Sequence, residues 1–290
     1  MTLTAVSVAL IGGVSAAASA FAGTTSSARR FVVPAGSYLV ASGSGRLLVL
    51  NPRGKLLRRG PRLAGRVQAL ALSPDRRSAY VSVYARPAHL YKVALGSGEK
   101  VLIAKAISPS LSPDKTELAY VTVAMQDDIE YRTALVIRDL QTGNLRTIAF
   151  PPGVPMDTPP PIIINWSPDG HSIVVFDGTD TRIVNVASAQ TVDSQPAIPG
   201  AARAYAPVFV GPHTLVALLG CCIGSQQLTS IDLDTDAQTP FAQVGSPIEN
   251  VRWLHGRTLL ATTALHRLVR ITQGRKAEAV TKLDIVAASP

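Results

Sequence analysis

The stretch that decides the fold is Ile164–Phe176, which reads INWSPDGHSIVVF. An apolar run leads into Ser167-Pro168-Asp169-Gly170, and a second apolar run follows. Proline fixes φ at the first turn position, and the aspartate side chain can accept a hydrogen bond from the backbone two residues further on. This pattern predicts a β-hairpin. The same pattern recurs in LALSPDRRSAYVSV at Leu70–Val83 and in PSLSPDKTELAYVTV at Pro109–Val123.

Three weaker copies bring the number of repeats to six. They are FVVPAGSYLVAS, PVFVGPHTLVAL and VRWLHGRTLLAT, at Phe31–Ser42, Pro207–Leu218 and Val251–Thr262. The turns recur about every forty residues, and each hairpin is followed by a third and a fourth apolar strand. A strand-only repeat of this length is typical of propeller blades with four strands each. Leu283–Ala287 is expected to add to an outer strand and close the ring.

The Ser-Pro-Asp-Gly turn in a unit of this length resembles those of the TolB-type, WD-repeat-like β-propellers. The full motif stands only at Ser167–Gly170, and two other copies keep Ser-Pro-Asp. The resemblance implies an all-β, six-bladed propeller of four-stranded antiparallel blades. It also implies protein, peptide or cell-envelope partners. The motif is structural, so it assigns no activity.

The amino-terminal part of the chain has the composition of a targeting segment. Thr2–Gly23 is an uncharged apolar run, and Ala18-Ser19-Ala20 resembles a signal-peptidase site. No basic residue precedes the run, whereas Arg29 and Arg30 follow it, so either the signal is atypical or the reading frame starts upstream. We expect a signal peptide or membrane-anchor helix over residues 1–23, a linker over 24–30 and a propeller over 31–290. The protein is thus expected to be secreted or anchored outside the cytoplasm.

The chain lacks the common catalytic motifs. Its 290 residues contain no Gly-Xaa-Ser-Xaa-Gly elbow and no phosphate-binding glycine motif. His171, His213 and His255 fall on equivalent turns of three repeats, too far apart to share a metal ion. Asn165 and Arg252 are the polar candidates for facing the channel. We predict a non-enzymatic binding, sensing or scaffold module without cofactor or metal; the alternatives are a lactonase-like propeller hydrolase with an axial site and a structural ectodomain of a membrane regulator.

Two local features stand out from the repeats. Cys221 and Cys222 are adjacent and flanked by glycines, which would permit the backbone of a vicinal disulfide; free thiols and an intermolecular bridge are the alternatives. Asp127, Asp128 and Glu130 place three acids within four positions. Such acids can bind calcium, although the EF-hand pattern is absent and a solvated acidic loop is the commoner outcome.

Charge divides the chain into two halves. Ala106–Pro247 contains 6 basic and 14 acidic residues, for a net charge of −8, whereas the rest contains 22 basic and 5 acidic residues, for +17. The densest basic stretch runs from Arg53 to Arg66 and suits an anionic surface, such as lipid headgroups or a wall polymer, or is simply a solubilising face. Nucleic acid is disfavoured, because no stacking aromatics are interleaved with these charges.

The variable loops are expected on one face of the disc. The turns between first and second strands are short, whereas the loops between second and third strands and those between blades vary in length, as loops that carry function do. Tyrosine and arginine are favoured interface anchors. We therefore expect a partner at the channel mouth on this loop face, near Tyr84, Arg86, Asp127, Asp128, Glu130, Tyr131, Arg132, Arg203 and Tyr205.

Overall fold

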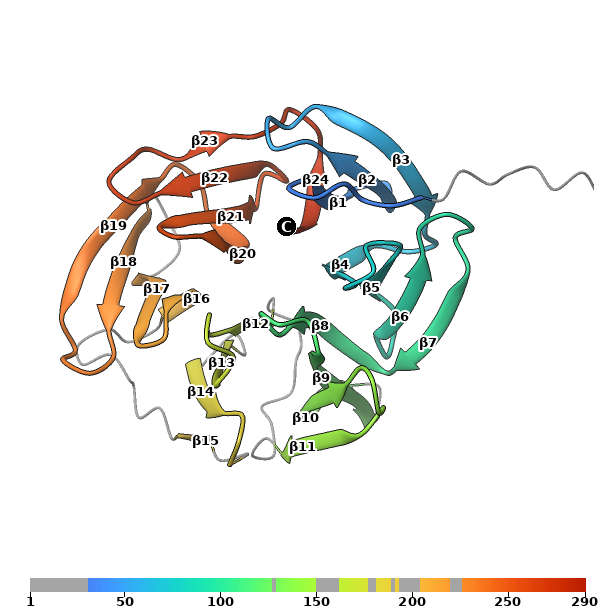
Figure 1. The fold of residues 1–290 in the computed structure, drawn as a ribbon, viewed down its shortest axis with the longest axis horizontal. Helices are drawn as coiled ribbons and strands as arrows, with labels where there is room; N and C mark the ends of the chain where they lie inside the picture. The colour runs from blue at the N-terminus through green and yellow to red at the C-terminus, as the bar shows by residue number, and fades with distance from the viewer. Residues whose placement is uncertain are drawn as a thin grey trace, which may run out of the picture.

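The computed structural model describes residues 31–126, 129–149, 162–176, 181–188, 191–192, 204–219 and 226–290. All its regular elements are strands, and they form six four-stranded sheets arranged as a ring (Figure 1). Among the described residues, no helix has the length and apolar character that crossing a bilayer requires. The expected amino-terminal helix over residues 1–23 lies outside the described part.

The first three blades follow the repeats. Blade 1 contains β24 (Ile285–Ser289), β1 (Tyr38–Ser42), β2 (Arg46–Leu50) and β3 (Leu56–Arg62). Blade 2 contains β4 (Val67–Leu72), β5 (Ser78–Val83), β6 (His89–Ala94) and β7 (Lys100–Ala104). Blade 3 contains β8 (Ala106–Leu111), β9 (Glu117–Gln126), β10 (Ile129–Asp139) and β11 (Leu145–Ala149).

The other three blades complete the ring. Blade 4 contains β12 (Ile163–Trp166), β13 (Ser172–Phe176), β14 (Thr181–Asn185) and β15 (Thr191–Val192). Blade 5 contains β16 (Ala204–Gly211), β17 (Thr214–Leu219), β18 (Gln226–Asp232) and β19 (Gln238–Val244). Blade 6 contains β20 (Ile248–His255), β21 (Thr258–Thr263), β22 (Leu268–Thr272) and β23 (Glu278–Ala279).

The blades are held together by apolar faces that pack against each other. One core cluster joins Leu39 and Val49 of blade 1 to Leu70 and Val81 of blade 2, all of them buried. Equivalent clusters join blades 3 and 4, and blades 4, 5 and 6. Strands buried on both faces need apolar residues at successive positions, which explains runs such as VQALAL in β4. The packing makes the ring a rigid support for its loops.

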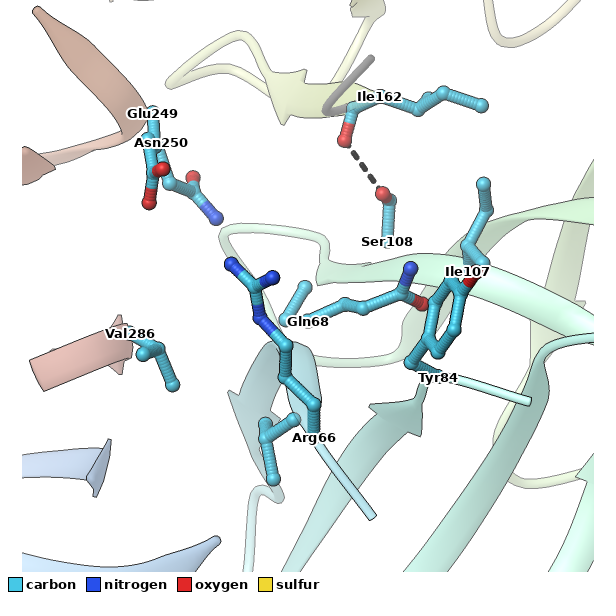
Figure 2. Close-up of a pocket in the computed structure, with 11 residues that line it drawn as sticks. Arg66, Gln68, Tyr84, Ile107, Ser108, Ile162, Glu249, Asn250 and Val286 are labelled. Carbon is cyan, nitrogen blue, oxygen red and sulfur yellow. Dashed lines mark hydrogen bonds between the residues drawn. The ribbon is translucent and has the colours of Figure 1, made fainter. Parts of the chain in front are cut away.

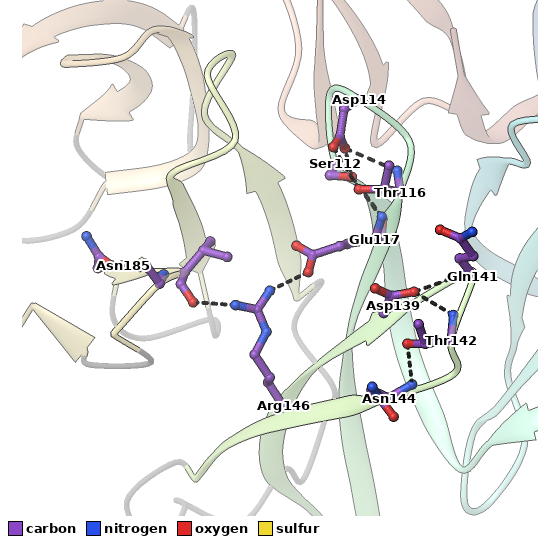
Figure 3. A network of polar contacts seen from close by, with 12 residues as sticks. Ser112, Asp114, Thr116, Glu117, Asp139, Gln141, Thr142, Asn144, Arg146 and Asn185 are labelled. Carbon is purple, nitrogen blue, oxygen red and sulfur yellow. Dashed lines mark hydrogen bonds and ion pairs between the residues drawn. The ribbon is translucent and has the colours of Figure 1, made fainter.

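The Ser-Pro-Asp motifs form the predicted turns, with one shared bonding pattern. Each aspartate Oδ1 accepts a bond of 2.5 Å from the serine Oγ and another from the backbone N–H two residues further on. In the second copy, hydrogen bonds from Ser112 and Thr116 lower the pKa of Asp114 (Figure 3). The motif therefore stabilises hairpins, as the sequence predicts.

A polar contact also joins two blades near this turn. Arg146 of β11 pairs with Glu117 of β9 and donates to the backbone oxygen of Val186, 2.8 Å away in blade 4 (Figure 3). The side chain thus links the outer part of blade 3 to the turn that follows β14. Because Arg146 is partly exposed, we regard this contact as fixing the relative position of the blades more than as a large source of stability.

Ring closure differs from the expectation. Leu283–Ala287 was expected to extend an outer strand, but β24 is the innermost strand of blade 1 and pairs with β1 in the register Leu39↔Ser289 (Figure 1). Phe31–Val33, which begins the first repeat, forms no strand. The physical reason is burial: Ile285–Ala288 is an apolar run with every residue buried, and an outer edge would leave it exposed.

A second difference concerns Ala124–Arg132, where the sequence predicts a loop between the second and third strands of blade 3. The structure has a long hairpin here, because β9 and β10 remain paired as far as Gln126↔Ile129. Ile129 and Tyr131 favour extended backbone within this stretch, and the nearby acids obscure that preference. The strand pairing thus reaches Gln126 and Ile129, and the two aspartates between them lie outside the described residues.

Candidate functional site

One end of the central channel is defined by the starts of the innermost strands. The strands β4, β8, β12 and β20 each begin there and end at the turn that leads to the second strand of their blade. The Ser-Pro-Asp turns therefore lie at the opposite end. The β5–β6 loop, Tyr84–Ala88, lies at the same end as the start of β4, since β4 and β5 are antiparallel. We call this end the channel mouth.

A cavity of about 240 Å³ opens at the channel mouth. Its walls come from blades 1, 2, 3, 4 and 6, so it forms only when the ring is complete. Figure 2 shows the side chains that converge on it. Those with polar groups are Arg66, Gln68, Tyr84, Ser108, Glu249 and Asn250.

Two of these polar side chains carry buried acceptors without a partner. In the described part of the chain, three buried side-chain atoms lack a hydrogen bond: Gln68 Oε1, Asn250 Oδ1 and Thr262 Oγ1. The first two line the cavity, and Thr262 is directly opposite Asn250 in the sheet. Buried polar groups normally have partners, because leaving one unpaired costs about 1–3 kcal/mol. The channel mouth is therefore set up to accept hydrogen bonds from a donor.

The charged groups at the mouth are also unpaired. Arg66 and Glu249 come from blades 2 and 6, and neither makes an ion pair with any residue that the structure describes. Figure 2 shows the Arg66 guanidinium extending into the cavity, toward the side chain of Asn250. A charged arginine here attracts an anionic group, while Glu249 across the cavity favours a cationic one. The site thus suits a ligand with several polar groups rather than a purely apolar one.

Tyr84 and Ser108 complete the wall next to Arg66. Tyr84 is 40% exposed, and its backbone N–H donates to the Arg66 carbonyl over 2.8 Å. Ser108 has a left-handed backbone, with φ of 56°, and its Oγ donates to the Ile162 carbonyl over 2.5 Å. That bond joins blade 3 to the residue preceding blade 4 and fixes the rim of the cavity (Figure 2).

The predicted loop-face residues lie in different parts of the structure, and only some of them are near the cavity. Tyr84 lines the cavity, and Arg86 is exposed in the same β5–β6 loop. Tyr205 is in β16, with its ring edge-on to Phe176 at a centroid distance of 5.3 Å, and Arg132 is a partly buried residue of β10. Glu130 and Tyr131 are in the β10 strand. Asp127, Asp128, Arg203, Cys221 and Cys222 lie outside the described residues.

Asn165 and Arg252, the predicted channel-facing pair, are bonded to each other. Arg252 Nη1 donates to Asn165 Oδ1 over 2.8 Å and to the Ile164 carbonyl over 2.9 Å. Asn165 Nδ2 donates in turn to the Pro207 carbonyl over 2.8 Å. Burial lowers the pKa of Arg252 to about 10. This cluster connects the innermost strands of blades 4, 5 and 6, so its hydrogen bonds stabilise the contacts between neighbouring blades.

His171 and His213 lie on turns between the first and second strands of blades 4 and 5, as predicted, and His255 is the last strand residue before the corresponding turn of blade 6. His171 Nδ1 lies 3.2 Å from Asp169, and His213 Nδ1 lies 3.0 Å from Asp234. Among the described residues, no group of three histidine, cysteine or acidic side chains is arranged to hold a metal ion.

Sequence reasoning missed Arg66, Gln68, Glu249 and Asn250. A signal exists for Gln68, which is a polar residue near the start of the otherwise apolar β4, whereas Asn250 lies in β20 among other polar residues. Their convergence depends on ring closure, which brings blades 2 and 6 to either side of β24. A reading along the chain does not show that proximity.

Comparison with solved structures identifies the architecture. TolB from Acinetobacter baumannii superposes with a TM-score of 0.61 at 12% identity, over 87% of this chain and 65% of that one. The domain is a six-bladed β-propeller with a fold similar to that of TolB. A chain of a nidogen/laminin complex gives a TM-score of 0.62 at 10% identity, over 87% of this chain and 97% of that one.

A third solved structure superposes on this propeller with a lower TM-score. Hydrazine synthase of Kuenenia stuttgartiensis matches with a TM-score of 0.51 at 13% identity, over 81% of this chain and 76% of that one. No family model and no curated protein matches the sequence. At these identities the comparisons show the fold alone, which hosts unrelated functions.

Proposed function

We propose that this TolB-like propeller is an extracytoplasmic, non-enzymatic binding module that receives a segment of a protein partner at the channel mouth. The observation that carries the proposal is the pair of unpartnered acceptors, Gln68 Oε1 and Asn250 Oδ1, in one cavity. The fold's similarity to TolB and to a chain of a nidogen/laminin complex supports a protein-binding role in general. The apolar run Thr2–Gly23 supports a location outside the cytoplasm.

A peptide segment offers what the cavity lacks. Its backbone N–H groups can donate to Gln68 Oε1 and Asn250 Oδ1, which satisfies atoms that are buried without a partner in the free protein. Its polar or charged side chains can meet Arg66 and Glu249 on either side of the cavity. Tyr84 supplies a rigid and partly exposed aromatic ring, a common anchor at protein interfaces. Gln68, Glu249 and Asn250 lie in strands, and Arg66 and Tyr84 are directly next to strands, so little backbone entropy is lost on binding.

The proposal predicts that binding is sensitive to substitutions at the mouth. Random peptides displayed on phage are selected on the purified full-length chain, and a selected peptide is labelled for fluorescence anisotropy. We expect Tyr84→Ala and Asn250→Ala each to weaken its affinity roughly tenfold or more, which corresponds to about 1.4 kcal/mol.

Matched controls lie at the opposite end of the channel. His171→Ala and His255→Ala alter exposed residues on or next to first-to-second-strand turns, and we expect each to change the affinity less than about twofold. Arg76 is unsuitable as a control, because its guanidinium donates to the carbonyls of Val33 and Pro34. If the histidine variants lose affinity and the mouth variants do not, the peptide binds at the opposite end of the channel and the proposal is wrong.

A further inference from the structure

The positive charge of the protein is concentrated in two neighbouring blades. Residues 31–105, which include three strands of blade 1 and all of blade 2, contain 13 lysine or arginine residues and only two acids, Asp75 and Glu99. Their net charge is +11, whereas the whole chain has +9. A charge this unbalanced exceeds what solubility requires and creates a strong local potential.

Part of this charge lies on the outer edge of the disc. The strands β3 and β7 are the outermost strands of blades 1 and 2, and they follow each other around the ring (Figure 1). We define the basic rim by seven exposed side chains of these strands and of the neighbouring β6: Leu57, Arg58, Arg59, Lys92, Lys100, Val101 and Leu102.

The basic rim combines charged side chains with exposed apolar ones, and the Lys100 ammonium lies 5.4 Å from the centre of the Tyr91 ring. In the part of the chain that the structure describes, Arg59, Lys92 and Lys100 form no ion pair. Leu57, Val101 and Leu102 are 48%, 56% and 53% exposed, although each is large and apolar. Basic side chains that surround exposed aliphatic ones are typical of surfaces that rest on anionic lipid, where the charges meet headgroups and the apolar groups enter the interface.

The chain enters the propeller at this rim. Phe31 lies under the Arg58 guanidinium, 5.0 Å from its ring centre, and packs next to Gly60 of β3 and Gly96 of the β6–β7 turn. Seven residues, 24–30, separate Phe31 from the apolar run Thr2–Gly23, and a chain of that length spans at most about 25 Å. If the apolar run enters a membrane, the basic rim is the part of the disc held nearest to it.

We propose that the basic rim docks on the surface of an anionic lipid bilayer. The phosphate groups of the lipid neutralise the arginine and lysine side chains, and Leu57, Val101 and Leu102 enter the interfacial layer. The disc then stands on its edge, so that both of its ends, including the channel mouth, remain open to a partner. This docking is independent of the proposed peptide site, because no residue of the basic rim lines the cavity.

The test is flotation of the purified full-length chain with two kinds of vesicle. One kind is pure phosphatidylcholine, and the other contains one quarter phosphatidylglycerol. Insertion of an apolar amino-terminal run would contribute equally to both kinds of vesicle, so the rim is measured by the ratio of the two affinities. We expect this ratio to be roughly tenfold or more at 0.1 M salt and to fall toward one at 0.5 M salt.

Two triple variants with the same change of charge locate the effect. Arg59→Glu, Lys92→Glu and Lys100→Glu reverse the rim, whereas Arg257→Glu, Arg275→Glu and Lys276→Glu reverse exposed residues of blade 6. The rim variant is expected to lose the preference for anionic vesicles and the blade 6 variant to keep most of it. Circular dichroism confirms that both variants are folded, and their binding of the selected peptide stays unchanged.

Three results would overturn the proposal. One is equal affinity of the native chain for the two vesicles, and another is equal loss in the two variants, which would reflect net charge alone. The third is a soluble polyanion such as heparin binding to the rim while anionic vesicles do not, which would assign the surface to a polymer. A negative result with vesicles does not change the measured affinity for the selected peptide, so the two proposals can be refuted independently.

Discussion

Removing Ile285–Pro290 is expected to abolish cooperative unfolding of the propeller. The deletion takes away β24, the innermost strand of blade 1, and with it the pairing to β1 and the packing against β4 and β21. Ile285 and Ala287 are fully buried, and the inner edge of β1 would be left without a partner. We expect the truncated chain to aggregate, or to lose its sharp transition in a urea titration followed by the fluorescence of Trp166 and Trp253.

Two controls separate ring closure from simple shortening. Removing only Pro290, which is exposed and follows β24, is expected to leave the transition unchanged. Adding a synthetic peptide of residues 284–290 to the truncated chain is expected to restore part of the transition, because the peptide can occupy the vacant edge of β1. If the chain without Ile285–Pro290 unfolds at the urea concentration of the native protein, β24 does not close the ring.

Gly54→Ala is the substitution with the largest expected effect on stability. Gly54 lies in the β2–β3 turn with φ of 78°, and a β-carbon there would come 1.7 Å from the backbone oxygen of Val280. A backbone atom cannot move aside as a flexible side chain can, so the turn must shift away from the segment that leads to β24. We expect the free energy of unfolding to fall by about 3 kcal/mol or more.

Gly274→Ala is the matched control for this effect. Gly274 has nearly the same φ, 73°, but an added β-carbon would meet nothing within 4 Å. The control therefore measures the cost of a left-handed alanine alone, about 1–2 kcal/mol. Chemical denaturation gives the free energy of unfolding of both variants, and the difference between the two losses is the cost of the clash. Equal losses would show that Gly54 is required only for its backbone conformation.

The sequence predicts the blades well because the information is local. A strand, a Ser-Pro-Asp turn and a second strand lie within fifteen residues, and the turn bonds of Asp75, Asp114 and Asp169 form as their spacing predicts. The partner of Ile285–Ser289 is not local. Apolar alternation identifies this segment as a strand, but only the closed ring decides that it pairs with Tyr38–Ser42.

The candidate site is predictable only in part, for the same reason. Tyr84 is found from its place in a variable loop, whereas Gln68 and Asn250 are exceptional because their acceptors are buried without partners. That property depends on side chains of several blades and is absent from any single repeat. Asn165 and Arg252 show the same limit. Their polarity within innermost strands marks them as candidates for the channel, but their hydrogen bonds connect neighbouring blades, which the sequence does not show.

Hydrogen exchange is the measurement that tests the channel-mouth proposal most directly. Amide exchange of the full-length chain is followed by mass spectrometry with and without a saturating amount of the selected peptide. We predict slower exchange in residues 66–69, 84–88 and 248–250, which surround the cavity, and no change in the turns at 73–78 and 112–117. Protection of those turns without protection of the mouth would contradict the account.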